Sequence, residues 1–264
     1  MNYEFPLVIF TVFTQFAVGL ALFAAWKSLR CVGSSAKECE GIPAWRGKDW
    51  RFVLLLAVTG LVASLFHLAQ PLRAAEVLGN LSVSWLSREC LLFGIFTVLT
   101  LMIVFRESRC LAVMAALVGL AGIVAQGFTY APAAMPAINN GVPMLLFLLS
   151  ALTLGSASGQ VNGAHNFSTV FLMACAALIA VLLIMPCLWS SGSAMMQACA
   201  ALWMQSWMFW IGLGLLILAL IVSLRSGAKA AFPCVLLALS GVVLTRIVLF
   251  SGTVHTAVNL GMPY

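Results

Sequence analysis

Charged residues are scarce in this sequence: only 8% of its 264 residues are Asp, Glu, Lys or Arg, whereas 63% are hydrophobic. A soluble domain normally carries about a quarter charged residues and about half apolar ones. A soluble core of this size could not hide so many apolar side chains, so lipid must solvate the surplus. The composition therefore excludes an ordinary soluble enzyme and indicates an integral membrane protein.

Patterns for binding metal or haem are also missing. The eight cysteines include no C-x-x-C pair, which leaves a metal or redox motif without support. Haem held between helices needs axial ligands at facing depths, and among the histidines His67, His165 and His255 only a His67–His255 pair is conceivable. We therefore expect neither haem nor metal in this chain. Cys187 and Cys199 flank one outer loop where a disulfide is permitted, although two free thiols are the plainer expectation.

Long apolar runs, in contrast, are abundant. A membrane-spanning helix needs roughly 20 apolar residues. Candidate spans lie at residues 6–26, 51–70, 85–105, 110–130, 141–159, 167–186, 197–224 and 232–250. The seventh is long, so we expect it either to tilt or to begin with an interfacial stretch holding Trp203, Trp207 and Trp210. The sequence predicts an all-α fold: one integral-membrane domain over residues 1–264, a polytopic bundle of about eight transmembrane helices.

Positive charge is concentrated in every second connection. The first connection carries most of the Lys and Arg, the third and seventh carry a few, and the even-numbered connections hold only Arg73. Cytoplasmic loops carry the excess of Lys and Arg in membrane proteins. The pattern therefore places the odd-numbered loops inside and both termini outside.

A few polar side chains interrupt the apolar segments, and ionisable groups there cost a few kcal/mol each, which makes each a functional candidate. They are Gln15, His67, Arg88, Glu89, Gln126, Tyr130 and Arg246. At 1.5 Å per residue, His67, Glu89 and Arg246 lie ~6 Å from the outer ends of their helices. Tyr130 closes the fourth helix on the same side. Four helices therefore bring polar groups to one level near the outer face.

Such a cluster suits quinol oxidation, which needs a lipid-accessible pocket, a hydrogen-bond partner for the ring oxygen and an acceptor for two protons. Histidine titrates nearest physiological pH, and either His67 or Glu89 could act as the general base. The competing interpretation is structural: Glu89 would pair with Arg88 or Arg246 merely to neutralise buried charge.

One segment resembles a known family. Residues His67 to Glu89 read HLAQPLRAAEVLGNLSVSWLSRE. This run is similar to the signature of the membrane-anchor subunits of dimethyl sulfoxide reductase, in which H-L-x-x-P-x-R-A is followed by S-x-L-S-x-E at this spacing. The opening Glu4–Gly19 and the closing Thr245–Met262 also look like the ends of that family.

The resemblance implies a haem-free subunit of the bacterial inner membrane, with both termini periplasmic. It would anchor a molybdopterin catalytic subunit and an iron–sulfur subunit, oxidise menaquinol near the periplasmic face and pass the electrons to the iron–sulfur partner. By the same resemblance His67 and Glu89 would be the catalytic pair of the quinol site, and Arg73 would support them. Arg88, Tyr130 and Arg246 join the expected quinol site because of their depth.

Two other functions compete with this one. A small-solute transporter normally has a site near the midplane, with broken helices and repeats, whereas here the polar groups gather at one edge. A purely structural anchor would leave the burial of His67 and Glu89 without a functional reason. The loop after the first helix, with Cys31 and Cys39, departs from the family pattern, and the terminal electron acceptor is not readable from this chain.

Overall fold

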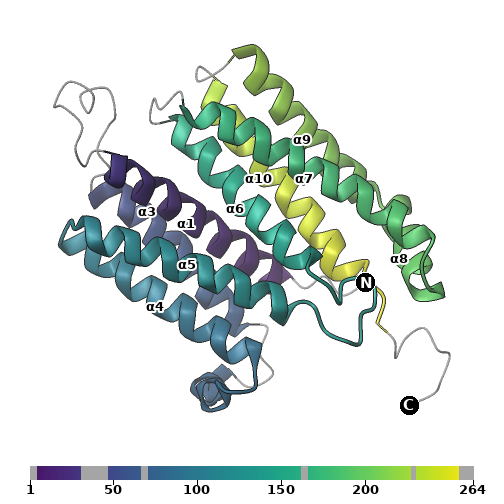
Figure 1. Cartoon of the computed structure of the whole chain (residues 1–264), viewed down its shortest axis with the longest axis horizontal. Coiled ribbons are helices and arrows are strands. Elements are labelled where there is room, and N and C mark those ends of the chain that lie inside the picture. Colours follow the sequence, from purple (N-terminus) through teal and green to yellow (C-terminus); the bar gives the residue numbers. More distant parts are fainter. Residues whose placement is uncertain (1–4, 31–46, 67–70, 162–165, 227–229, 256–264) are drawn as a thin grey trace.

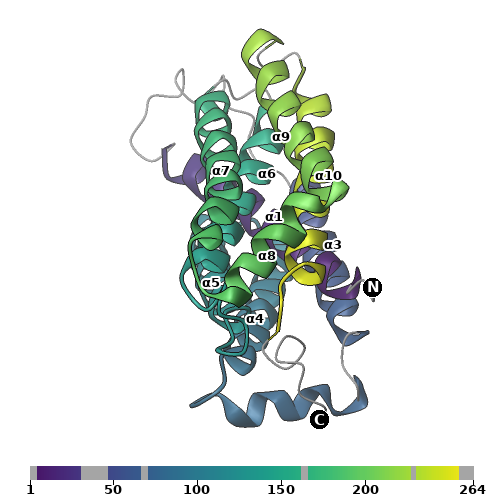
Figure 2. The same ribbon diagram turned by 90° about the vertical axis from the view of Figure 1, so that its right-hand side faces the viewer.

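The computed structural model describes residues 5–30, 47–66, 71–161, 166–226 and 230–255, and within these ranges it contains helices and no β-strand. The arrangement of the described helices is drawn in Figures 1 and 2, and the bounds of the long ones follow the apolar runs of the sequence. They are α1 (Phe5–Arg30), α3 (Gly47–Leu65), η1 (Pro71–Asn80), α4 (Trp85–Phe105), α5 (Arg109–Thr129), α6 (Val142–Val161), α7 (Asn166–Ser190), α8 (Ala194–Gln205), α9 (Trp207–Ser226) and α10 (Ala231–Ser251). The predicted all-α bundle is confirmed.

Seven of the described helices are long and apolar enough to cross a membrane, which is close to the predicted eight. The remaining long helix, α3, has 19 residues but begins with Lys48, Asp49 and Arg51, so its apolar stretch is shorter. It ends at Leu65, five residues before the predicted end at 70. Because of these charged residues at its start, α3 is not among the seven helices that are apolar enough to cross a membrane.

The predicted seventh span is two helices, with a break at Ser206 between α8 and α9. Ser206 has extended backbone angles (φ −77°, ψ 117°), which end the α8 hydrogen-bond ladder. The indole of Trp210 donates across the break to the carbonyl of Met204, at 2.8 Å. Trp203 packs edge-on against Trp189 of α7, with ring centroids 4.9 Å apart. The start of this segment is therefore a separate short helix that holds Trp203, whereas Trp207 and Trp210 belong to α9.

The long helices form two groups of four that share one order of packing. In the first group α1 packs on α3 and α5, and α4 packs on the same two helices. In the second group α6 packs on α7 and α10, and α9 packs on the same two. The groups meet chiefly where α1 lies beside α6, so that α1 runs through the middle of the molecule (Figure 1). The α1 window that could span a membrane is 83% buried.

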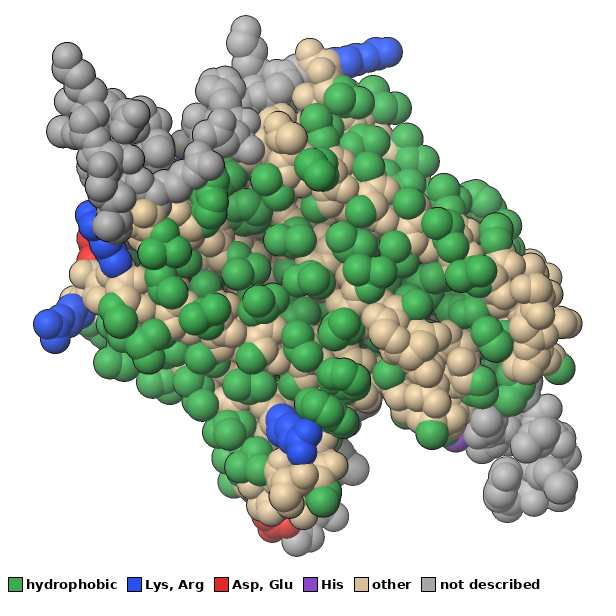
Figure 3. Space-filling view, viewed as in Figure 1, with side chains coloured by type: hydrophobic (Ala, Val, Ile, Leu, Met, Phe, Trp, Pro, Cys, Tyr) green, Lys and Arg blue, Asp and Glu red, His purple; other side chains and the backbone are tan. Residues whose placement is uncertain are grey.

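The surface is apolar around the middle of the bundle and charged towards its ends (Figure 3). Exposed arginines lie at helix ends that share the upper-left end of the bundle in Figure 1. They are Arg51, Arg106, Arg109 and Arg225. This grouping agrees with the loop pattern on which the predicted orientation rests, and the orientation itself stays a prediction. At the opposite end η1 lies across the helix ends and packs on α4 (Figure 2).

The cysteines at the opposite end of the bundle from these arginines are unpaired. Cys187 is exposed in α7, Cys199 is buried in α8, and both are free thiols. The Cys199 sulfur accepts a hydrogen bond from the backbone N–H of Val254 at 3.1 Å. The disulfide considered from the sequence is therefore wrong, and the plainer expectation of two free thiols is correct.

Candidate functional site

Glu89 is a buried carboxylate in the first turns of α4. The side chain of Ser84 accepts a hydrogen bond from the N–H of Ser87 and so caps the helix start. This start places Glu89 against α5, fully buried, with its carboxyl facing Gln126 and Thr129. Neither carboxyl oxygen meets hydrogen-bond geometry with any residue that the structure describes. Buried polar atoms are normally hydrogen-bonded, so this group is unusual.

A chain of hydrogen bonds leads from Glu89's neighbour Gln126 across the centre of the bundle. The Gln15 amide nitrogen of α1 donates to Oε1 of Gln126 at 2.7 Å. Gln15 in turn accepts with its own Oε1 from Nη2 of Arg246 in α10, at 2.9 Å. All four side chains are buried. Four helices, α4, α5, α1 and α10, therefore contribute to one polar cluster that crosses from the first group of helices to the second.

Arg246 has a mixed polar and aromatic surrounding. Its Nη2 also donates to the Ser150 hydroxyl of α6 at 3.1 Å. Its guanidinium lies 4.1 Å above the centroid of the Phe147 ring, a favourable cation–π contact. Tyr130, at the end of α5, packs edge-on against Phe147 and Phe250, with centroid distances of 5.8 and 5.3 Å. The Arg246 Nη1 atom is buried without a hydrogen-bond partner among the described residues.

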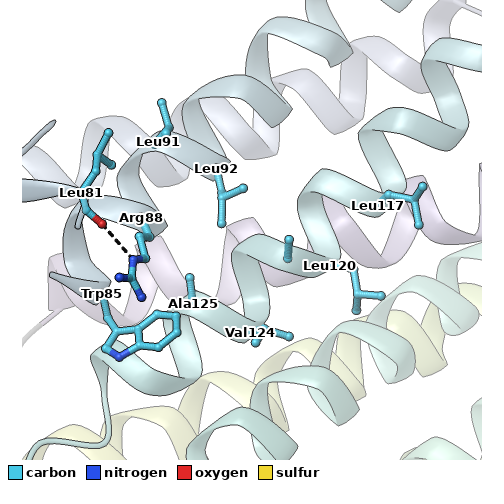
Figure 4. Close-up of a pocket in the computed structure, with 10 residues that line it drawn as sticks. Leu81, Trp85, Arg88, Leu91, Leu92, Leu117, Leu120, Val124 and Ala125 are labelled. Carbon is cyan, nitrogen blue, oxygen red and sulfur yellow. Dashed lines mark hydrogen bonds between the residues drawn. The ribbon is translucent and has the colours of Figure 1, made fainter. Parts of the chain in front are cut away.

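Arg88 points to a different place, an open apolar groove between α4 and α5 (Figure 4). Its Nε donates to the carbonyl of Leu81 at 2.9 Å and its Nη2 to the carbonyl of Ser82 at 2.6 Å. The guanidinium also lies 4.4 Å from the centroid of the Trp85 ring. The groove has a volume of about 630 Å³ and is lined by Leu81, Trp85, Arg88, Leu91, Leu92, Leu117, Leu120, Ala121, Val124 and Ala125. One cation and one indole therefore mark one end of an otherwise aliphatic groove.

The groove and the buried cluster are adjacent along both helices. Arg88 lines the groove and the next residue, Glu89, is buried in the cluster. On α5, Ala125 lines the groove and the next residue, Gln126, faces Glu89. The wall between an apolar, lipid-facing groove and a buried carboxylate is thus the α4–α5 contact itself. An apolar chain held in the groove would therefore lie one residue along each helix from the buried polar cluster.

The structure unites part of the predicted site. Glu89, Tyr130 and Arg246 lie around the cluster, whereas Arg88 lies in the groove beside it. His67 lies outside the described residues. Arg73 belongs to η1, but its side chain lies outside the described part of the chain. The proposed pairing of Glu89 with Arg88 or Arg246 does not occur, since the hydrogen bonds of both arginines go to other groups.

The sequence did not identify the residues that join the cluster together. Gln15 and Gln126 stood out as polar residues in apolar helices, but nothing in the sequence paired them. Ser150 gave no signal, because small hydroxyl residues are common in membrane helices. Within the described ranges no three His, Cys, Asp or Glu side chains lie together as metal ligands. The expected absence of haem and metal stays a prediction.

Comparison with known proteins shows that the chain matches a known protein family. A family model described as "DMSO reductase anchor subunit (DmsC)" matches residues 1–253. The C subunit of the anaerobic dimethyl sulfoxide reductase of Haemophilus influenzae is 28% identical over 162 residues, which cover 58% of this chain and 56% of that protein. The YnfH subunit of an anaerobic dimethyl sulfoxide reductase of Escherichia coli is 34% identical over 94 residues, 36% of this chain and 31% of that protein. The matched regions thus span about half or less of these relatives' lengths.

Proposed function

Because this chain belongs to the family of dimethyl sulfoxide reductase anchor subunits, we propose that it is the membrane anchor of a reductase complex and oxidises a quinol. The substrate is menaquinol, and the electrons pass to an iron–sulfur partner subunit that serves a molybdopterin catalytic subunit. The site lies at the outer, periplasmic end of the bundle in the bacterial inner membrane. The terminal acceptor is chosen by the catalytic subunit.

The buried carboxyl of Glu89 is the observation that carries the proposal. A membrane helix that buries a carboxyl group without a hydrogen-bond partner does so at a cost of a few kcal/mol. Glu89 is fully buried, and neither oxygen has such a partner among the described residues. A quinol hydroxyl that reaches Glu89 would supply the missing donor. The carboxylate would accept its proton as the ring is oxidised.

The groove between α4 and α5 suits the other part of a quinol. A long isoprenoid tail is apolar, and the groove is lined by Leu, Ala and Val side chains apart from Trp85 and Arg88. Its contact with the lipid face would let the substrate enter sideways from the bilayer. The ring end would then lie near Arg88 and Glu89, where the polar groups are. Lipid-facing entry and a buried acceptor are the two features that quinol oxidation requires.

The proposed residues and the partner subunit account for all the electrons and protons of the reaction. Oxidation of one quinol to the quinone releases two electrons and two protons. Glu89 and His67 are the proposed proton acceptors; His67 enters through the sequence motif alone. The two electrons leave for the iron–sulfur partner, and the two protons leave to the outer side. Arg73, Arg88, Tyr130 and Arg246 complete the proposed site as supporting residues.

The test uses the assembled complex and two electron donors. Glu89→Gln keeps the size of the side chain but removes the proton acceptor, so we expect quinol-driven reduction to fall at least about a hundredfold. Reduction driven by an artificial dye that donates directly to the partner subunits should keep the wild-type rate. His67→Gln should behave alike. A wild-type quinol rate in Glu89→Gln would leave only a structural anchor.

A further inference from the structure

The hydrogen-bond chain from Arg246 to Gln126 has a direction that is fixed by chemistry. A guanidinium has five N–H donors and no acceptor. Gln15 must therefore turn its carbonyl oxygen to Arg246, which leaves its amide nitrogen for Gln126. Gln126 must then accept with its own carbonyl oxygen. Its amide nitrogen is left facing Thr14, at 3.5 Å, and the carboxyl of Glu89.

We propose that Arg246 and Gln15 are positioning residues that act through Gln126 to keep an N–H donor turned towards the carboxyl of Glu89. This inference rests on the proposed function, in which Glu89 accepts a proton from the quinol. Neither Arg246 nor Gln15 forms a hydrogen bond with Glu89. Their role is to orient the Gln126 amide so that its nitrogen, and not its oxygen, faces Glu89.

The choice matters because an amide has two ends of opposite character. With the nitrogen towards Glu89, Gln126 can donate to a carboxylate; with the oxygen towards Glu89, two acceptors would face each other. The two orientations have almost the same shape, so packing alone does not separate them. A donor held in place favours the ionised form of Glu89, which is the form that can accept a proton from the quinol. If Gln126 donates to Glu89 during the reaction, loss of that one hydrogen bond corresponds to about a three- to tenfold change in rate.

The buried position of the chain keeps this orientation stable. Gln15 and Gln126 are both fully buried, and Arg246 is only 3% exposed, so water does not compete for their hydrogen bonds. Phe147 of α6 covers one face of the guanidinium and Ser150 takes a second hydrogen bond from it. The second group of helices thus holds Arg246 in place. The first group carries Gln126 and Glu89.

The main experiment interrupts the chain between its charged ends. Gln15→Leu removes the link but leaves Arg246, Gln126 and Glu89 unchanged. We expect kcat for quinol to fall about three- to tenfold, with reduction by the artificial dye unchanged. The matched control is Gln160→Leu, the same substitution at another buried glutamine, in α6 and outside the cluster. Gln160→Leu should keep the quinol rate.

A second pair of variants tests the donor character of position 246. Arg246→Lys still offers only N–H donors, so it should lose less of the quinol rate than Arg246→Met does. Arg246→Met offers none, and should lose as much rate as Gln15→Leu or more. If Gln15→Leu does not assemble, Gln15→Asn serves instead, because its shorter amide cannot reach both partners. When Gln15→Leu is added to Gln126→Leu, the quinol rate should fall no further. Gln15 acts only through the Gln126 amide, which the first substitution has already removed.

A spectroscopic readout separates positioning from a general loss of packing. The carboxyl C=O band of Glu89 is the band that disappears from the redox-induced infrared difference spectrum in Glu89→Gln. This band should shift in Gln15→Leu, Gln126→Leu and Arg246→Met, and stay in place in Gln160→Leu. An unshifted band with a wild-type quinol rate in Gln15→Leu would overturn the positioning role and leave the proposed function standing. A wild-type quinol rate in Glu89→Gln would instead overturn the proposed function itself.

Discussion

Glu89 and Arg246 are both buried in the same polar cluster, yet they form no ion pair: two hydrogen-bonded glutamine side chains, Gln15 and Gln126, lie between them. A direct ion pair would have explained both residues as mutual neutralisation of charge. With Gln15 and Gln126 in between, the carboxyl oxygens stay without a hydrogen bond from any described residue. The arrangement leaves Glu89 available to a ligand, which is why we place the chemistry there.

The helix that carries Gln15, α1, approaches α6 closely at two glycines, Gly19 and Gly155. The Cβ of an alanine at Gly155 would lie 2.5 Å from the backbone of Gly19, and one at Gly19 would overlap the carbonyl oxygen of Ala151. Gly19→Ala should therefore push the helices apart and lower stability by about 1–3 kcal/mol, measured as a lower unfolding temperature in detergent. Gly94→Ala is the control, because a Cβ there meets nothing within 4 Å. Equal unfolding temperatures for both variants would contradict the tight crossing.

The sequence predicted the elements better than the contacts between them. Apolar length alone placed α4 and α10 within one or two residues, since lipid demands long uninterrupted runs. The break at Ser206 was not visible, because Trp, Met and Gln fit either one helix or two. Glu89 and Arg88 were predicted together, yet one step along a helix turns a side chain by about 100°, and they lie in different environments.

The chain of glutamines could not be predicted for a related reason. Depth along each helix can be counted from its ends, and this counting predicted that Glu89 and Arg246 lie at one level. Which side chains meet at that level depends on helix rotation and on which helices are neighbours. The packing of α1 between α5 and α10 brings Gln15 within reach of both Gln126 and Arg246. The sequence offered no repeat or charge pattern that specifies this packing.

The groove should bind the substrate tail, so filling it should weaken binding. Leu120 lines the groove, and a Trp there would occupy much of its volume. We expect Leu120→Trp to raise the KM for quinol about tenfold or more while kcat changes little. Leu218→Trp adds the same bulk at an exposed position on α9, away from the groove, and should leave KM unchanged. An unchanged KM in Leu120→Trp would exclude the groove as the tail site.

The proposed placement of the site at the outer end of the bundle predicts electroneutral turnover. Protons from the quinol would leave to the side on which the iron–sulfur and catalytic partners receive the electrons. No net charge then crosses the membrane, where each charge would otherwise do work against the potential. The complex in sealed vesicles, supplied with quinol and a voltage-sensitive dye, should build up no potential on addition of the terminal acceptor. A potential that an uncoupler abolishes would show that the site or the partners lie on the other side.

The most direct measurement of the central claim is to label the site with the substrate's own ring. A quinone that carries a photoreactive azido group on the ring is bound to the complex, illuminated and located by mass spectrometry of the digested protein. We predict that the label lies at the start of α4, within 85–93, and at the end of α5, within 121–130, and that excess quinol prevents it. Labelling of Glu89→Gln should fall as quinol affinity falls. A label confined to α7, α8 or α9 that quinol still displaces would contradict the site between α4 and α5.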